Sequence, residues 1–202
     1  KEAIMGLSSL LFLILFSFLL FVFIVFIISR FSKKKQLDFE PYISILIPAY
    51  NEGKNISNCI DSIYASNYPS SKMEIIAIDD GSKDNTLDVL SNYNIKILQQ
   101  EHKGKSEALN LGAKNAKNEF IVVIDADTTL DKNCIKELVK PLIDNGIGAA
   151  TGTSKVKNIK NIWTIFQNIE YHYNNLIRKS FSSVFKNGIW FFGALACYRK
   201  SA

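Results

Sequence analysis

Apolar residues are distributed along this chain in two different ways. An uncharged apolar run occupies residues 4–28, whereas beyond residue 41 short apolar stretches alternate with segments whose apolar residues recur at helical spacing. At a rise of about 1.5 Å per residue, the first run is long enough for a helix to cross a hydrocarbon core about 30 Å thick. We therefore expect a transmembrane helix at 4–28, a basic polar linker at 29–40 and one folded domain at 41–202.

The alternating pattern predicts the class of the folded domain. Short apolar runs predict strands at 43–47, 74–78, 95–98, 120–124, within 148–156 and at 190–199. Helical spacing predicts helices at 56–64, 87–90, 106–116, 135–143 and 162–177. Pro48 should close the first strand, and Pro141 should disturb the helix that contains it. Such alternation is typical of an α/β fold with a mainly parallel sheet and helices on both faces.

The net charge of +5 is concentrated near the first apolar run. Residues 1–35 contain five basic residues and one acidic residue, so the rest of the chain is nearly neutral. Basic residues that follow a span, here Arg30 and Lys33–Lys35, predict a cytoplasmic domain and attract anionic headgroups of a lipid bilayer. The neutral remainder argues against a nucleic-acid partner. A signal peptide is disfavoured because its apolar part usually covers only about 7–15 residues.

Two residue types that often carry chemistry are assigned no function here. The three cysteines, Cys59, Cys134 and Cys197, form no CxxC motif, and two of them fall on apolar helix faces. They are expected to be buried, reduced thiols of a cytosolic domain. His102 stands in a polar loop and is expected to be exposed to solvent.

Polar residues gather directly after three of the predicted strands. Asp79 and Asp80 follow the second strand, and Asp125 and Asp127 follow the fourth. The first strand leads into Pro48, Ala49, Tyr50, Asn51 and Glu52. In open parallel sheets, ligands bind beyond the carboxyl ends of the strands, so these residues predict a single site.

The residue types at this site suit a substrate that carries a diphosphate. Asp127 is expected to bind a divalent cation, Mg²⁺ or Mn²⁺, directly, while Asp125 binds the ion through water or holds a ribose hydroxyl. Such an ion would make a diphosphate a better leaving group. Lys105, at the start of a predicted helix, adds a mobile charge for phosphate. Asp80 can accept a ring N–H of a base.

Each of these assignments has a structural alternative. Acids that follow a strand often cap the next helix, and either Ser82 or Asp84 can cap the helix after Asp80. Lys105 taken alone would be read as a solvated surface lysine.

Four segments in this order resemble glycosyltransferase family 2, whose members have the GT-A nucleotide-sugar fold. They are Ile45–Glu52, Asp79–Thr86, Gly104–Asn110 and Asp125–Asp127, and the resemblance runs from Tyr42 to Ala202. It implies a nucleotide loop, an acid on uracil, a lysine near the diphosphate and a metal motif, respectively.

Two later segments point to one branch of that family. Gln167–Tyr171 is similar to the QxxEY segment of membrane-bound chitin, hyaluronan and poly-N-acetylglucosamine synthases, and 192–199 resembles their acceptor-side strand. This implies acceptor-side roles for Gln167, Glu170, Phe192 and Gly193.

The resemblance implies a metal-dependent, inverting transfer of a sugar from a UDP-sugar to a saccharide acceptor during polysaccharide synthesis. A catalytic carboxylate and the QxxRW motif of processive members are expected beyond Ala202. Two alternatives remain open: transfer to a polyprenyl-phosphate lipid, or an inactive membrane-anchored module that binds a nucleotide sugar.

Two other enzyme classes fit less well. Asp125–Thr129 matches the DxDxT motif of haloacid-dehalogenase phosphatases, but the acidic pair that such enzymes carry later in the chain precedes the motif here. A dinucleotide oxidoreductase is disfavoured because no GxGxxG follows a strand.

Overall fold

The computed structural model describes residues 2–31, 39–185 and 193–201, with side chains from residue 9 onward. Contacts divide the chain into two compact units. The first contains residues 1–36 and 154–191, and the second contains residues 37–153 and 192–202. The predicted folded domain is therefore interrupted by a segment that groups with the N-terminal helix.

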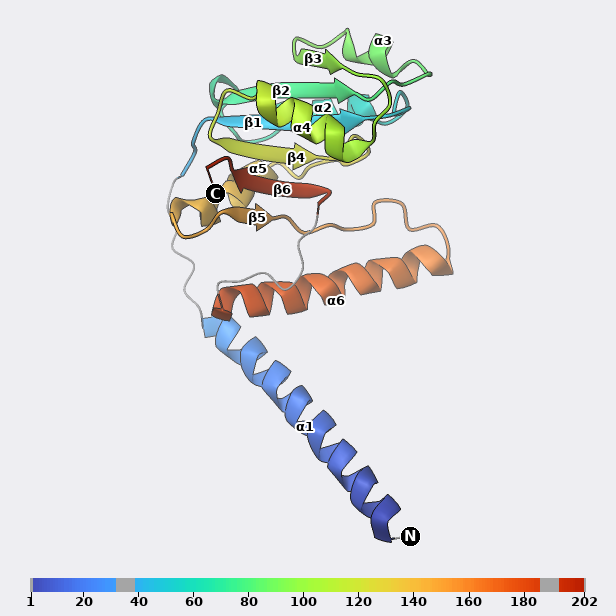
Figure 1. The fold of residues 1–202 in the computed structure, drawn as a ribbon, viewed down its shortest axis with the longest axis vertical. Helices are drawn as coiled ribbons and strands as arrows, with labels where there is room; N and C mark the ends of the chain where they lie inside the picture. The colour runs from blue at the N-terminus through green and yellow to red at the C-terminus, as the bar shows by residue number, and fades with distance from the viewer. Residues whose placement is uncertain (1, 32–38, 186–192, 202) are drawn as a thin grey trace. The chain divides into compact units, whose positions relative to one another are not determined.

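The second unit is built on one mixed sheet (Figure 1). Its strands are β1 (Ile43–Ala49), β2 (Met73–Asp79), β3 (Lys96–Gln99), β4 (Phe120–Ile124), β5 (Ala149–Thr151) and β6 (Leu195–Arg199), in the order β3-β2-β1-β4-β6-β5. Strands β1 to β4 pair in parallel, whereas β6 is antiparallel to both β4 and β5. The expected α/β fold is confirmed, with one antiparallel strand inserted near an edge.

Helices cover both faces of this sheet. The helices α2 (Ile56–Tyr64), α3 (Thr86–Leu90) and α5 (Cys134–Val139) contribute apolar side chains to the larger core, on one face. On the other face α4 (Lys105–Asn115) covers a smaller core, and it lies in front of the sheet in Figure 1. Fully buried residues of β1 alternate between the two cores, as expected for a central strand.

Two proline predictions had different outcomes. Pro141 does end α5, because a 3₁₀ turn at Lys140–Ile143 replaces its last turn. Pro48 does not close β1, which continues to Ala49. The carbonyl of Ala49 accepts the N–H of Asp80, so the backbone of Pro48 points to the opposite side, where the pairing with β4 has already ended. No ladder hydrogen bond is lost there, and the proline is tolerated.

The three cysteines lie in or against the larger core, as expected. Cys59 and Cys197 are buried, Cys134 is half-buried, and all three thiols are free. Burial raises the pKa of Cys197 to about 12 and, with a smaller contribution from Asp131, that of Cys134 to about 11.

The first unit contains two long helices, α1 (Glu2–Phe31) and α6 (Ile162–Phe185). Among the described residues, one helix is long and apolar enough to cross a membrane, over Ser9–Phe31. Its large apolar side chains are mostly exposed. The ring of Phe21 contacts those of Phe181 and Phe185 on α6, with centroids 6.0 and 6.4 Å apart. These ring contacts join α1 to α6 near Phe21, while most of the apolar surface of α1 is left exposed.

Candidate nucleotide-sugar site

A pocket of about 330 Å³ lies at the carboxyl ends of β1, β2 and β4. It is lined by Pro48, Ala49, Tyr50, Glu52, Asp80, His102, Lys105, Ala108, Asp125, Ala126 and Asp127. Parallel strands bring their carboxyl ends to one edge, and α4 begins at that same edge. The shared position predicted from the sequence is thus a single pocket in the fold.

The β4 side of the pocket carries the two acids of the Asp125–Asp127 motif. The Nζ of Lys105 lies 2.5 Å from Asp125 Oδ1, and both side chains are partly exposed. The N–H of Asp125 donates to the carbonyl of Ala194, which ties the motif to the start of β6. Asp127 is exposed, and no hydrogen bond reaches its carboxylate from the described residues. This wall therefore presents one paired and one open carboxylate beside a mobile ammonium group.

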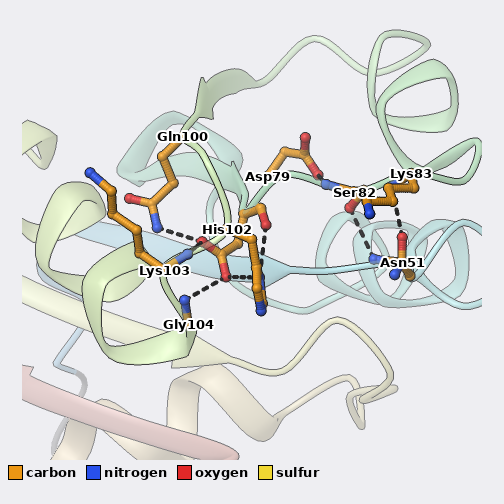
Figure 2. A network of polar contacts seen from close by, with 9 residues as sticks. Asn51, Asp79, Ser82, Lys83, Gln100, His102, Lys103 and Gly104 are labelled. Atoms are coloured by element: carbon orange, nitrogen blue, oxygen red, sulfur yellow. Dashed lines mark hydrogen bonds and ion pairs between the residues drawn. The ribbon is translucent and has the colours of Figure 1, made fainter.

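The β2 side of the pocket is organised around the carboxylate of Asp80, which is only 3% exposed. Its partners are Gln100, His102, Lys103 and Gly104, which Figure 2 labels. Gln100 Nε2 and the Lys103 N–H donate to Oδ1 at 2.5 and 2.9 Å. The Gly104 N–H and His102 Nδ1 lie 2.8 Å from Oδ2. A carboxylate accepts about four hydrogen bonds, so Asp80 is fully occupied by its own fold.

These contacts determine the charge state of Asp80. Burial alone would raise the pKa of this carboxyl. The hydrogen bonds from Gln100, Lys103 and Gly104, followed by the nearby His102, outweigh burial and hold the pKa below its usual value. Asp80 is therefore a carboxylate at neutral pH, and it fixes the loop that leads into α4 and Lys105.

A second network joins the loop after β1 to the loop after β2. The Asn51 N–H donates to Ser82 Oγ at 2.9 Å, and the Lys83 N–H donates to Asn51 Oδ1 at 2.8 Å (Figure 2). Asn51 has a φ of +55°, which asparagine tolerates better than most residues. The hydroxyl of Ser82 thus braces the β1 loop instead of capping α3.

Asp84 lies one residue before Asn85, the N-cap of α3, and of the two candidates that the sequence left open it is the one that binds the start of this helix. Its Oδ1 accepts the Thr86 N–H at 3.0 Å, and its Oδ2 accepts the Gly53 N–H at 3.0 Å. The hydrogen bond from the Thr86 hydroxyl is the main reason that the pKa of Asp84 is lowered. The same side chain therefore satisfies the start of α3 and holds the loop that precedes α2.

Eight of the residues predicted for donor and metal binding line the pocket together: Pro48, Ala49, Tyr50, Glu52, Asp80, Lys105, Asp125 and Asp127. Asn51 and Asp79 do not line it. The buried Asp79 accepts the Ser82 N–H at 3.3 Å, so these two side chains shape the loops around the pocket.

The four residues predicted for the acceptor side are distributed differently. Gln167 and Glu170 lie on α6, which belongs to the first unit, and Phe192 lies outside the described residues. Gly193 immediately precedes Ala194, whose carbonyl binds Asp125. Their acceptor-side role stays a prediction.

His102 is a polar residue of the pocket lining to which the sequence assigned no function. Its side chain is 54% exposed, as expected, but it also pairs with Asp80. Its ring stacks on that of Tyr50, with centroids 4.0 Å apart and an interplanar angle of 24°. Its position three residues before Lys105 was the one available signal.

A divalent ion fits the residues of this pocket. Within the part of the chain that the structure describes, no cluster of three or more potential metal-ligating residues occurs. Mg²⁺ and Mn²⁺ commonly bind through one or two carboxylates together with substrate phosphates, so Asp125 and Asp127 suffice when a diphosphate supplies the other ligands. Burial, followed by the charges of Asp127 and Asp125, raises the pKa of the nearby Cys59 thiol to about 12.

Comparison with known families assigns this chain to a class of protein. The family model described as glycosyl transferase family 2 matches residues 44–201. The chain therefore belongs to glycosyl transferase family 2, and the predicted GT-A fold and glycosyltransferase class are confirmed.

Curated relatives indicate which branch of the family this chain resembles. A poly-β-1,6-N-acetyl-D-glucosamine synthase of Staphylococcus epidermidis is 35% identical over 135 residues, covering 64% of this chain and 32% of that protein. Its counterpart in Staphylococcus aureus is 34% identical over 154 residues, covering 70% and 36%, respectively. The chain thus spans about a third of the length of these relatives. They confirm the similarity to the polysaccharide-synthase branch.

Two solved structures share the fold. The mannosyltransferase PcManGT from Pyrobaculum calidifontis, in complex with GDP-Man and Mn²⁺, has a TM-score of 0.63 at 25% identity and covers 88% of this chain and 52% of its own. S. aureus TarS in complex with UDP-GlcNAc has a TM-score of 0.53 at 25% identity, covering 59% and 36%.

Proposed function

We propose that this chain contains the donor-binding part of an inverting glycosyltransferase that moves a sugar from a UDP-sugar to a saccharide acceptor in polysaccharide synthesis. The observation that carries the proposal is the pocket at the strand ends, which combines an acid–lysine pair, an open acid and an aromatic wall. Each part suits one part of a nucleotide sugar, namely the diphosphate, its metal ion and the base.

The β4 wall is assigned to the diphosphate. Lys105 is half exposed, and its ammonium group can leave Asp125 to meet a phosphate oxygen. Because Lys105 is the first residue of α4, the free N–H groups of that helix terminus attract the same anion. Both features stabilise the negative charge that develops on the departing nucleoside diphosphate.

Asp127 and Asp125 are assigned to a divalent ion, Asp127 directly and Asp125 through water or together with a ribose hydroxyl. When bound, Mg²⁺ or Mn²⁺ would supply the positive charge that makes the diphosphate a better leaving group. PcManGT with Mn²⁺ and GDP-Man gives a precedent on this fold.

The β1 and β2 loops are assigned to the nucleoside. Tyr50 offers a partly exposed aromatic ring, and Asp80 offers a carboxylate that is held ionised. A uracil base matches this pair because it is flat and carries a ring N–H. TarS with UDP-GlcNAc gives a precedent for this donor class in the same fold.

We assign the polysaccharide role and the membrane location together. The relatives that are synthases of poly-β-1,6-N-acetyl-D-glucosamine favour a saccharide acceptor over a lipid-linked one. The apolar helix α1, followed by basic residues, suits a cell-membrane protein with the pocket on the cytoplasmic side, where nucleotide sugars are made.

The test is calorimetric titration of the whole chain, in detergent, with UDP in the presence and absence of Mn²⁺. We expect binding that requires the metal and falls at least about 10-fold in Asp127→Ala, since the remaining carboxylate is paired with Lys105. Asp131→Ala is the matched control, because Asp131 lies on the same loop but does not line the pocket. Metal-independent binding, or equal losses in both variants, would contradict the proposal.

A further inference from the structure

The ring of His102 occupies the place that the proposed function gives to a nucleobase. It lies against the ring of Tyr50, with ring centroids 4.0 Å apart, and it forms part of the pocket wall. Stacking of a flat ring on an aromatic side chain is also how proteins hold nucleobases. One aromatic face therefore has two possible occupants, a side chain of the protein or a base of the ligand.

The polar edge of the imidazole repeats the chemistry of a base as well. His102 Nδ1 lies 2.8 Å from Asp80 Oδ2 and 3.1 Å from the Asp80 carbonyl oxygen. Both partners are acceptors, so Nδ1 must carry a hydrogen. The ring thus presents an N–H to Asp80 while its face lies on Tyr50. The ring N–H of uracil can make the same contact.

The two occupants exclude each other because Asp80 has no spare acceptor position. Its other three hydrogen bonds come from the backbone N–H groups of Lys103 and Gly104 and from Gln100. Backbone donors are fixed by the start of α4, and Gln100 is not stacked in the pocket. His102 is the half-exposed donor, and it is the one that also covers Tyr50.

The fold holds the backbone of His102 close to the loop after β2 while leaving its side chain able to turn. Gly81 has a φ of +74°, and a Cβ added there would lie 2.8 Å from the backbone nitrogen of His102. Only glycine allows the two segments to approach this closely. Because its side chain is half exposed, the ring of His102 can leave the pocket by a rotamer change while its backbone stays in place.

We propose that the imidazole of His102 fills the nucleobase subsite when no nucleotide is bound, and that a uracil-type base displaces it from both Tyr50 and Asp80. This inference rests on the proposed function, because it needs a nucleotide in the pocket. It makes His102 a built-in competitor that lowers the affinity of the site for its own donor. The free energy gained when a base binds should therefore be smaller than its own stacking and hydrogen bonding would provide, because the contacts of His102 are lost.

The test compares the wild-type chain with His102→Ala by titration with UDP and with pyrophosphate, each with Mn²⁺. Removal of the competitor should tighten UDP binding about 3- to 10-fold, because the free subsite no longer has to be vacated. Pyrophosphate lacks a base and should bind both proteins equally. CDP, whose ring nitrogen N3 is an acceptor, should gain less from the substitution than UDP.

The outcomes separate the two proposals. Weaker or unchanged UDP binding by His102→Ala, with pyrophosphate binding intact, would overturn the displacement while leaving the proposed function standing. Absence of both UDP and pyrophosphate binding in the wild type would overturn the proposed function and this inference with it.

A spectroscopic measurement tests the same proposal with His102 present, in case His102→Ala perturbs the loop. The chain has two histidines, so His172→Asn leaves the imidazole of His102 as a single resonance set. Nuclear Overhauser contacts between this ring and Tyr50 should be present without ligand and disappear as UDP is added. Contacts that persist at saturation would show that the ring stays in place, which would overturn the inference.

Discussion

The acids at the ends of β2 and β4 face the same pocket, yet the fold treats them in opposite ways. Asp80 is buried and receives hydrogen bonds on both oxygens from the segment 100–104. Asp127 is exposed and receives none from the described residues. Asp125 lies between these extremes, with 28% of its side chain exposed and a single ammonium partner.

The acids of the two motifs therefore differ in role, although the sequence presents them alike. One stabilises the fold, and the other is available to bind a ligand. A carboxylate whose acceptor positions are all filled holds the protein together, and it can contact a ligand only by exchanging a partner. An open carboxylate stabilises nothing in the free protein, but it is ready for a cation. The β2 end should therefore influence folding most strongly, and the β4 end should influence binding most strongly.

The largest expected effect is on stability at the β2 end. Asp80→Asn replaces a carboxylate that accepts four hydrogen bonds by an amide. The NH₂ group of this amide would face N–H donors of the loop and could not accept their hydrogen bonds. We expect the free energy of unfolding to fall by about 2–4 kcal/mol, the range for broken buried networks with charged members. Chemical denaturation of the chain in detergent, followed by circular dichroism, measures this loss.

Asp127→Asn provides the matched comparison at the β4 end. It should leave the unfolding free energy within about 0.5 kcal/mol of wild type, as is usual for exposed positions. Equal destabilisation by the two substitutions would show that the contrast between the two ends is not real.

The sequence predicted where these acids lie but not how differently their carboxylates are bound. Apolar runs that end in acids were enough to place β2 and β4 in a parallel sheet and to bring Asp80, Asp125 and Asp127 to one edge. That inference succeeds because strand polarity fixes which ends meet, and no side-chain detail is needed.

The partners of Asp80 could not be predicted in this way. They come from the loop at 100–104, which has no hydrophobic period and reaches Asp80 only through the pairing of β3 with β2. His102 was correctly expected to be exposed, yet exposure alone does not reveal a stack on Tyr50. The antiparallel insertion of β6 was equally hidden, because short apolar strands do not encode their direction.

A smaller effect is expected for the lysine that bridges the two ends. Lys105→Ala removes an ion pair with a half-exposed lysine, so stability should change by less than about 1 kcal/mol. Binding of pyrophosphate with Mn²⁺ should weaken about 10-fold, because the ammonium group is assigned to a phosphate. Calorimetry measures the affinity of the wild type and of Lys105→Ala for pyrophosphate. Lys103→Ala is the control, since Lys103 contributes its backbone N–H to Asp80 and its side chain does not line the pocket.

The smallest effect is the pH dependence of the β2 end. The folded pKa of Asp80 lies below the unfolded value of about 3.9, so its ionised form is favoured by folding. The stability that this charge contributes is fully present above pH of about 4 and is lost as pH falls through the lower, folded pKa. The difference in unfolding free energy between wild type and Asp80→Asn should therefore be flat above that pH and shrink below it.

Because the imidazole of His102 also contacts Asp80, this comparison is best made with both proteins carrying His102→Asn. The remaining donors on Asp80, from Gln100, Lys103 and Gly104, do not change charge, so any slope that survives belongs to the carboxyl group. A difference that grows as pH falls would mean that Asp80 is easier to protonate in the folded protein. Its hydrogen bonds would then be too weak to overcome burial, and the β2 end would be no more rigid than the β4 end.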